Sequence, residues 1–109
     1  MNHKEKVKVI QPRGIFDGRR GRKVYQEVMD SIDKHIETVL VDCQDIQFMD
    51  SSGFGTLLLT LKTVRQKKGR LVLCSLNEQI RMILELSDTA NIFEVFPDHS
   101  SFIATVPQQ

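Results

Sequence analysis

The segment FMDSSGFGTLLL, residues 48–59, places an acid and two hydroxyls directly before a leucine-rich run. Asp50, Ser51 and Ser52 are all of the types that cap the first turn of a helix, where four backbone N–H groups lack internal partners. The simplest interpretation is that one residue caps and the others fill a turn. The alternative is that one hydroxyl stays free at a position that tolerates negative charge, with the following glycines keeping its approach open.

A free hydroxyl at such a junction is a candidate for phosphorylation. A phosphoryl group there would meet backbone N–H donors and would add roughly −1.5 to −2 of charge without unfolding the helix. A partner docked beside Asp17 or Asp50 would then meet like-charge repulsion and a group that is costly to desolvate. This interpretation predicts a charge switch that controls binding.

Three other chemistries compete for the same residues. A phosphate-cradling loop would require GxxxxGK[ST] or GxGxxG, and neither is present. A serine nucleophile would require the GxSxG elbow and a histidine base, but the leading glycine is missing and His99 is the only histidine after the motif. Asp50 could act with Asp45 or Asp42 in acid–base catalysis, although carboxylates that flank a strand end are more often caps and loop formers.

The surrounding pattern predicts the strands that position this junction. Residues 38–43 and 71–74 are short and nearly all apolar, as expected of strands covered on both faces. Alternation at 6–10 predicts an opening strand, and residues 15–16 and 93–96 are expected to add short ones.

Four helices are expected between and after these strands. Apolar residues recur every four positions over about 21–36, which predicts a helix packed on one side. The next is expected to begin at Gly53 and to end before Gly69, where basic residues in the last turn and a following glycine fit the helix dipole and a left-handed cap. Asn77 and Asp98 are expected to start two further helices.

This alternation predicts an α/β fold with a single-layer mixed, partly parallel β-sheet of about five strands and about four helices. The 109 residues, 40% of them hydrophobic, fit a single domain spanning 1–109. Segment 48–54 is then expected where a central strand ends and its helix begins, which is the general location of ligand and regulatory sites in such folds.

The composition argues against several classes of function. Fifteen basic residues nearly balance fourteen acidic ones, and the basic cluster at 19–23 is short and poor in aromatics, so neither direct nucleic-acid nor membrane binding is expected. Cys43 and Cys74 lie in apolar stretches and are expected in the core, and the scattered histidines lack the spacing of a metal site. Without a membrane span or a signal peptide, a cytoplasmic protein is expected.

Residues 42–96 resemble the STAS domain family, and within it the stand-alone bacterial anti-sigma factor antagonists. The Asp-Ser-Ser-Gly at 50–53, set between an apolar strand and a leucine-rich helix, is similar to the recognition motif of the family. Upstream, the Gly-Ile-Phe-Asp at 14–17 resembles the family's Gly-Glu-Leu-Asp. The resemblance covers most of the chain and implies a STAS-like arrangement of the α/β fold.

The resemblance implies a phosphoswitch without a cofactor of its own. Ser52, the second serine of the motif, matches the residue that accepts phosphate from a cognate anti-sigma factor, itself a serine kinase of the histidine-kinase ATPase type. The unmodified antagonist captures that kinase and frees a sigma factor, the phosphorylated form lets go, and a metal-dependent serine phosphatase resets the switch. Because the kinase supplies ATP and magnesium, this chain would be substrate and binder, not an enzyme.

The resemblance also implies roles for the residues around Ser52. The phosphosite environment is expected to consist of Asp50, Ser51, Gly53 and Asp17. The partner-binding residues are expected to be Asp17, Gly18, Arg19, Ser52, Gly53 and Thr56. The chain departs from the family at Ile15, where glutamate is usual, and in its basic cluster, and both lie on the loop expected to face the partner.

Other functions stay open from the sequence. A ligand-sensing STAS module for a nucleotide or lipid would have an apolar or basic pocket near residues 19–22. The same phosphoswitch could serve a non-sigma target in another pathway built from similar kinase and phosphatase parts. A small enzyme is disfavoured because no base is paired to the serines.

Overall fold

Helices and strands alternate along residues 6–107, the part of the chain that the computed structural model describes. The strands are β1 (Val7–Ile10), β2 (Gly14–Phe16), β3 (Thr38–Asp42), β4 (Ile46–Met49), β5 (Arg70–Cys74) and β6 (Glu94–Phe96). The helices are α1 (Gly18–Asp33), α2 (Ser51–Gln66), α3 (Glu78–Leu86) and α4 (His99–Ile103).

Four of the strands form the main sheet, in the order β1-β3-β5-β6, and every pairing in it is parallel. β3 lies between β1 and β5, and all five of its residues are buried. This is the pattern of a strand covered on both faces. β2 and β4 form a separate parallel pair, in which Phe16 lies opposite Met49.

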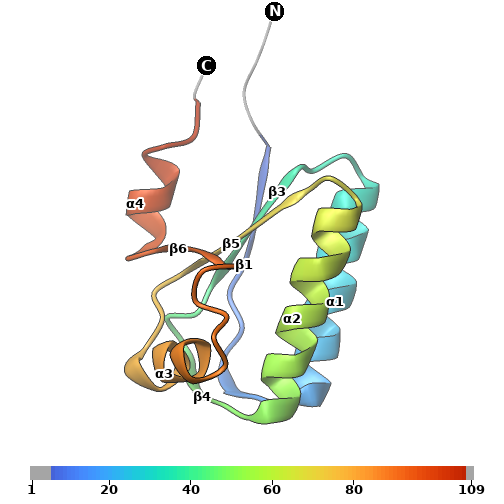
Figure 1. Ribbon diagram of the computed structural model, residues 1–109. Coiled ribbons are helices and arrows are strands. Elements are labelled where there is room, and N and C mark those ends of the chain that lie inside the picture. Colours follow the sequence, from blue (N-terminus) through green and yellow to red (C-terminus); the bar gives the residue numbers. More distant parts are fainter. Residues whose placement is uncertain (1–5, 108–109) are drawn as a thin grey trace, which may run out of the picture.

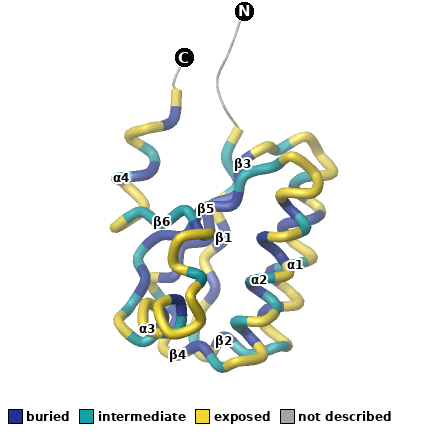
Figure 2. The backbone as a smooth tube through the Cα atoms, viewed as in Figure 1, coloured by how far each residue is buried: buried dark blue, intermediate teal, exposed yellow. Residues whose placement is uncertain are grey.

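Alternate residues of the central strands pack into two cores, one on each face of the sheet. Val39 and Val41 belong to the larger core, which α1, α2 and α3 cover. Leu40 belongs to the smaller one, where it meets Phe102 of α4. The chain thus forms three layers, with α4 alone on the second face of the sheet (Figure 1), and the buried residues are concentrated in the sheet and on the helix sides that face it (Figure 2).

The helices α1 and α2 lie side by side and begin at the same end of the molecule, next to β2 and β4 (Figure 1). Their close approach depends on Gly21, because a Cβ built there would lie 1.7 Å from Oγ1 of Thr56. The shared starting end brings residues 17–22 close to residues 50–56.

The structure confirms the α/β class and the four helices, and it adds one strand to the about five expected. The additional strand is β4, which the sequence hides because only its end residues, Ile46 and Met49, are buried. The prediction that the serine junction follows a central strand is therefore wrong, since α2 follows β4 of the two-stranded sheet. The expected mixed sheet also differs in detail, because each strand pairing among the described residues is parallel.

The helix ends differ from the expected ones for local reasons. α1 begins at Gly18 and ends at Asp33, shortly before His35 takes a left-handed φ of 67°. After α2, the left-handed residue is Lys68 with φ 62°, not Gly69. Gly69 is instead closely packed, since a Cβ there would lie 2.9 Å from Cδ1 of Ile32.

Two predicted helix caps and the placement of the cysteines are confirmed. Asn77 and Asp98 cap α3 and α4, each accepting a hydrogen bond from the backbone three residues ahead. Cys43 and Cys74 are both buried.

Candidate functional site: the start of helix α2

Asp50 alone caps helix α2. Its backbone is extended, with φ −96° and ψ 178°, and its Oδ1 accepts a hydrogen bond of 2.8 Å from the N–H of Gly53. Its own N–H donates to the carbonyl oxygen of Phe16 in β2, at 3.2 Å. The acid of the motif therefore satisfies the helix start and ties it to the neighbouring strand.

The two serines of the motif are not used as caps. Both are exposed in the first turn of α2, and neither hydroxyl makes a hydrogen bond within the described part of the chain. Because Asp50 already performs the capping, the fold leaves two free hydroxyls at a helix start, where the backbone dipole favours negative charge.

Gly53 lies where β2 comes closest to α2. A Cβ built on it would lie 1.9 Å from the carbonyl oxygen of Phe16, far inside van der Waals contact. Glycine is therefore required at this position by packing.

Helix α3 holds β4 in place from the other side. The side-chain amide of Gln79 accepts from the N–H of Met49 at 2.9 Å and donates to the carbonyl of Met49 at 2.7 Å. Asn77 donates to the carbonyl of Ile46 at 3.0 Å. These bonds satisfy backbone groups of β4 and position the residue directly before Asp50.

The start of α1 completes the site. Asp17 caps this helix, with its Oδ1 accepting from the N–H of Arg20 at 3.0 Å, and that hydrogen bond holds the pKa of the Asp17 carboxyl below its ordinary value. Gly18 follows directly, and a Cβ built on it would lie 3.3 Å from Cβ of Ser52. The two helix starts, each with an acidic cap, thus meet at Gly18 and Ser52.

The sequence that builds this site also matches a known protein family. The sequence profile of the STAS domain covers residues 1–102. The chain belongs to the STAS domain family.

Curated relatives of this STAS domain are anti-sigma factor antagonists by name. The anti-sigma F factor antagonist of Paenibacillus polymyxa is 28% identical over 98 residues, which cover 89% of this chain and 81% of the relative. The putative anti-sigma factor antagonist BtrV of Bordetella bronchiseptica is 30% identical over 82 residues, 75% of this chain and 71% of the relative.

Solved structures share the fold at lower identity. A putative anti-sigma factor antagonist of Thermotoga maritima superposes with a TM-score of 0.81 at 20% identity, over 94% of this chain and 88% of that one. Unphosphorylated SpoIIAA gives 0.74 at 18% identity over 95% and 93% of the two chains. Phosphorylated SpoIIAA of Bacillus gives 0.69 at 19% identity over 92% and 91%.

Most of the site residues expected from the sequence lie together in this STAS domain, but Gly53 is buried and Thr56 is oriented differently. Asp17, Gly18 and Arg19 stand beside the serine motif on the start of α1. Thr56 instead faces α1 at Gly21, and its hydroxyl donates to the carbonyl of Gly53 at 2.7 Å. Its position favours a role in packing the two helices.

Two exposed apolar residues lie beside the motif, and the sequence reasoning singled out only one of them, Ile15. Ile15 and Phe48 are opposite each other in the β2–β4 pair, and each is 47% exposed. A shallow groove next to Phe48 is lined by Asp50, Ser51 and Phe54 as well. Phe48 was missed because the sequence did not reveal β4, in which it pairs with Ile15.

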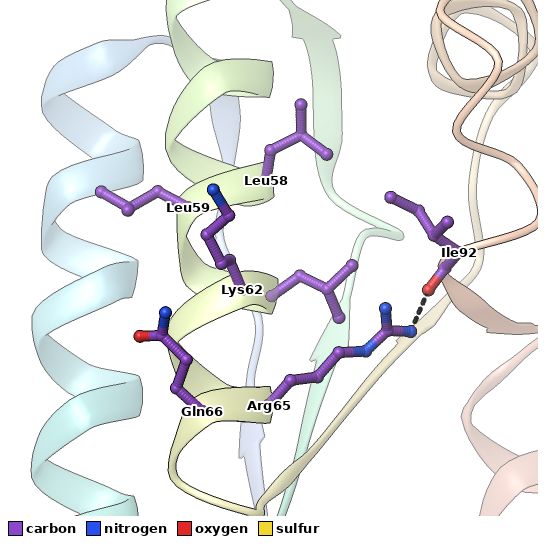
Figure 3. Close-up of a pocket in the computed structure, with 7 residues that line it drawn as sticks. Leu58, Leu59, Lys62, Arg65, Gln66 and Ile92 are labelled. Carbon is purple, nitrogen blue, oxygen red and sulfur yellow. Dashed lines mark hydrogen bonds between the residues drawn. The ribbon is translucent and has the colours of Figure 1, made fainter.

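The pocket that a ligand-sensing module would require near 19–22 is an open groove. Its lining comes from α1 alone: Arg19, Arg22, Lys23, Gln26, Glu27 and Asp30. A cavity of about 700 Å³ lies instead against the later turns of α2, where Lys62 and Arg65 flank leucine side chains and the Arg65 guanidinium donates to the carbonyl of Ile92 (Figure 3). Neither space contains a residue of the serine motif.

The residues considered for catalysis or metal binding are used elsewhere. Nδ1 of His99 lies 4.0 Å from Oδ2 of the buried Asp42, and Asp45 accepts from Gln11 and lies 3.7 Å from Arg13. Over residues 6–107, no group of three or more His, Cys, Asp or Glu side chains could hold a metal ion. No helix in that range has the length and apolar character needed to cross a membrane.

Proposed function

We propose that this STAS domain is an anti-sigma factor antagonist whose binding is switched by phosphorylation of Ser52. The observation that carries the proposal is the free, exposed hydroxyl of Ser52 at the start of a helix that Asp50 already caps. The names of the curated relatives support the partner class. The existence of solved structures of SpoIIAA in both unphosphorylated and phosphorylated forms supports the type of switch.

In the unmodified state, the partner docks across the two helix starts. The contact surface comprises Asp17, Gly18 and Arg19 of the α1 start with Ser52 of α2, and the buried Gly53 supports it from beneath. The partner is an anti-sigma factor with serine kinase activity, and its capture releases a sigma factor.

Phosphorylation changes the charge of this surface without changing the fold beneath it. The new group adds roughly −1.5 to −2 of charge between the carboxylates of Asp17 and Asp50. Desolvating that group in a tight interface is costly, so the partner dissociates. A metal-dependent serine phosphatase then restores the hydroxyl.

The proposal assigns the chemistry of phosphate transfer to the partners. The kinase supplies ATP and magnesium, so the STAS domain acts as substrate and binder over residues 1–109, as one domain in the cytoplasm. The positions of His99 and Asp45 agree with this assignment, because both are engaged with residues outside the serine motif.

Intact-mass measurement after incubation with a candidate kinase and ATP tests the proposal. One phosphate is expected on the wild-type chain and on Ser51→Ala, and none on Ser52→Ala. Equal phosphorylation of both serines, or of neither with every cognate kinase from the same genome, would contradict it.

A second arm separates a switch from a structural role. Ser52→Asp should weaken capture of the kinase at least tenfold while leaving the melting temperature nearly unchanged, because negative charge is favourable in the first turn of a helix. Ser51→Asp, at the neighbouring exposed position, is the matched control. Unfolding of Ser52→Asp would show that residue 52 has a structural role instead.

A further inference from the structure

The Arg22 guanidinium and the Ser52 side chain both approach Gly18. A Cβ built on Gly18 would lie 3.3 Å from Cβ of Ser52 and 3.4 Å from Nη1 of Arg22. The separation between Cβ of Ser52 and Nη1 of Arg22 therefore cannot exceed the sum of these two distances. That span is about the reach of a phosphoryl group from a serine Cβ plus one charge-assisted hydrogen bond of ~2.8 Å.

Arg22 is available for such a contact. It is exposed one turn into α1, and within residues 6–107 its side chain makes no ion pair or hydrogen bond. The other arginines at the helix start are placed differently. The charges of Arg19 and Arg20 act on the carboxylate of Asp17, and the backbone of Arg20 binds that same carboxylate.

We propose that Arg22 is an intramolecular ligand of the phosphoryl group on Ser52, which it binds across the gap left by Gly18. The inference rests on the proposed phosphorylation of Ser52 and adds the residue that holds the phosphate once it is there. A guanidinium suits this role, because its planar donors match two phosphate oxygens at once.

The charges around the site explain why a cation is needed there. Asp17 and Asp50 cap the two helix starts that meet at Gly18 and Ser52, and each carboxylate accepts a backbone hydrogen bond that keeps it in place. Both repel a dianion. Arg22 offsets this repulsion from its place beside Gly18, which has no side chain to intervene.

The contact has a consequence for the switch. A phosphate bound to Arg22 lies over Gly18, on the surface where the partner is proposed to dock. It therefore covers that surface in addition to changing its charge, and the phosphatase must break the contact with Arg22 before it can reach the group.

Phosphorus NMR of a chain with phosphoserine at position 52 tests the inference. The phosphoserine is installed during translation with a dedicated tRNA and synthetase, so no kinase is required. A nearby cation stabilises the dianion and lowers the second pKa of the phosphate, which is about 6 without neighbours. Arg22→Gln should raise this pKa by about half a unit, the size expected for an exposed ion pair.

Two variants make the result specific. Lys23→Gln removes the same charge from the adjacent position of α1, and we expect it to shift the pKa by less than half as much as Arg22→Gln. Arg22→Lys keeps the charge but loses the paired donors, so its pKa should lie between those of wild type and Arg22→Gln. The exposed location of Arg22 predicts an unchanged amide spectrum for all three.

The outcomes separate this inference from the proposed function. Equal shifts for Arg22→Gln and Lys23→Gln, or no shift for Arg22→Gln, would overturn the contact with Arg22 and leave phosphorylation of Ser52 intact. Absence of phosphate in the kinase experiment would overturn the proposed function, even where the installed phosphoserine titrates as expected.

Discussion

At the scale of single residues, Gly53 controls the geometry of the motif more directly than either serine does. Its Cα faces the carbonyl oxygen of Phe16, a backbone atom that cannot rotate away. Ser51 and Ser52 are exposed, so packing does not restrict their side chains. The motif therefore combines a residue that packing requires with neighbours that packing leaves available for chemistry.

A pair of glycine substitutions in α2 tests this distinction. Gly53→Ala should lower the free energy of unfolding by about 1–3 kcal/mol, because the new methyl group must displace β2. Gly55→Ala is the matched control: its Cβ would have no neighbour within 4 Å, so the better helix propensity of alanine should raise stability by ~0.5–1 kcal/mol. Urea denaturation measures both. Similar changes for the two variants would contradict the close approach of Phe16.

At the scale of elements, helix α3 determines where the serine junction stands. β4 has a single strand partner, β2, and amide side chains of α3 satisfy backbone groups of Ile46 and Met49. An unpaired strand edge is thus covered by side chains of a helix. α3 contributes no predicted contact with the partner, but it fixes the end of β4 from which Asp50 and the serines follow.

Removing the Gln79 amide should loosen this edge. Gln79→Ala loses two hydrogen bonds to Met49, and we expect a loss of about 1–3 kcal/mol in the free energy of unfolding. The amide of Met49 should also exchange with solvent faster. Arg81→Ala, an exposed position of the same helix, is the control and should change neither quantity. Unchanged exchange at Met49 in Gln79→Ala would rule out α3 as the support of β4.

At the scale of the whole molecule, the parallel sheet separates two cores and places one cysteine in each. Cys43 packs with the helices α1 to α3, and Cys74 packs beside Phe102 of α4. The backbone N–H of Cys43 donates to the carbonyl of Cys74 at 2.9 Å, so the two backbones are adjacent although the side chains pack in different cores. Burial raises the pKa of both thiols, that of Cys74 to about 11.

These placements predict two protected thiols that do not pair. At pH 8 the native chain should react with a thiol-alkylating reagent at least a hundredfold more slowly than the chain in urea, because both thiols are buried and protonated. Mild oxidation should produce no internal disulfide, because the side chains lie on opposite faces of the sheet. Mass spectrometry after each treatment measures the result. Rapid native alkylation, or a native disulfide, would contradict the two-core arrangement.

The sequence by itself determined the order of most elements, the caps at Asn77 and Asp98, and the place of the serine motif at a helix start. These features depend on local hydrophobic periodicity and on side chains that bind their own backbone, so a short window of residues contains them. Only the tertiary structure decided that β4 pairs with β2, that Phe16 faces Gly53, and that Arg22 and Ser52 both approach Gly18. Such contacts join segments far apart in the chain, and their geometry follows from how the layers pack, which no local pattern specifies.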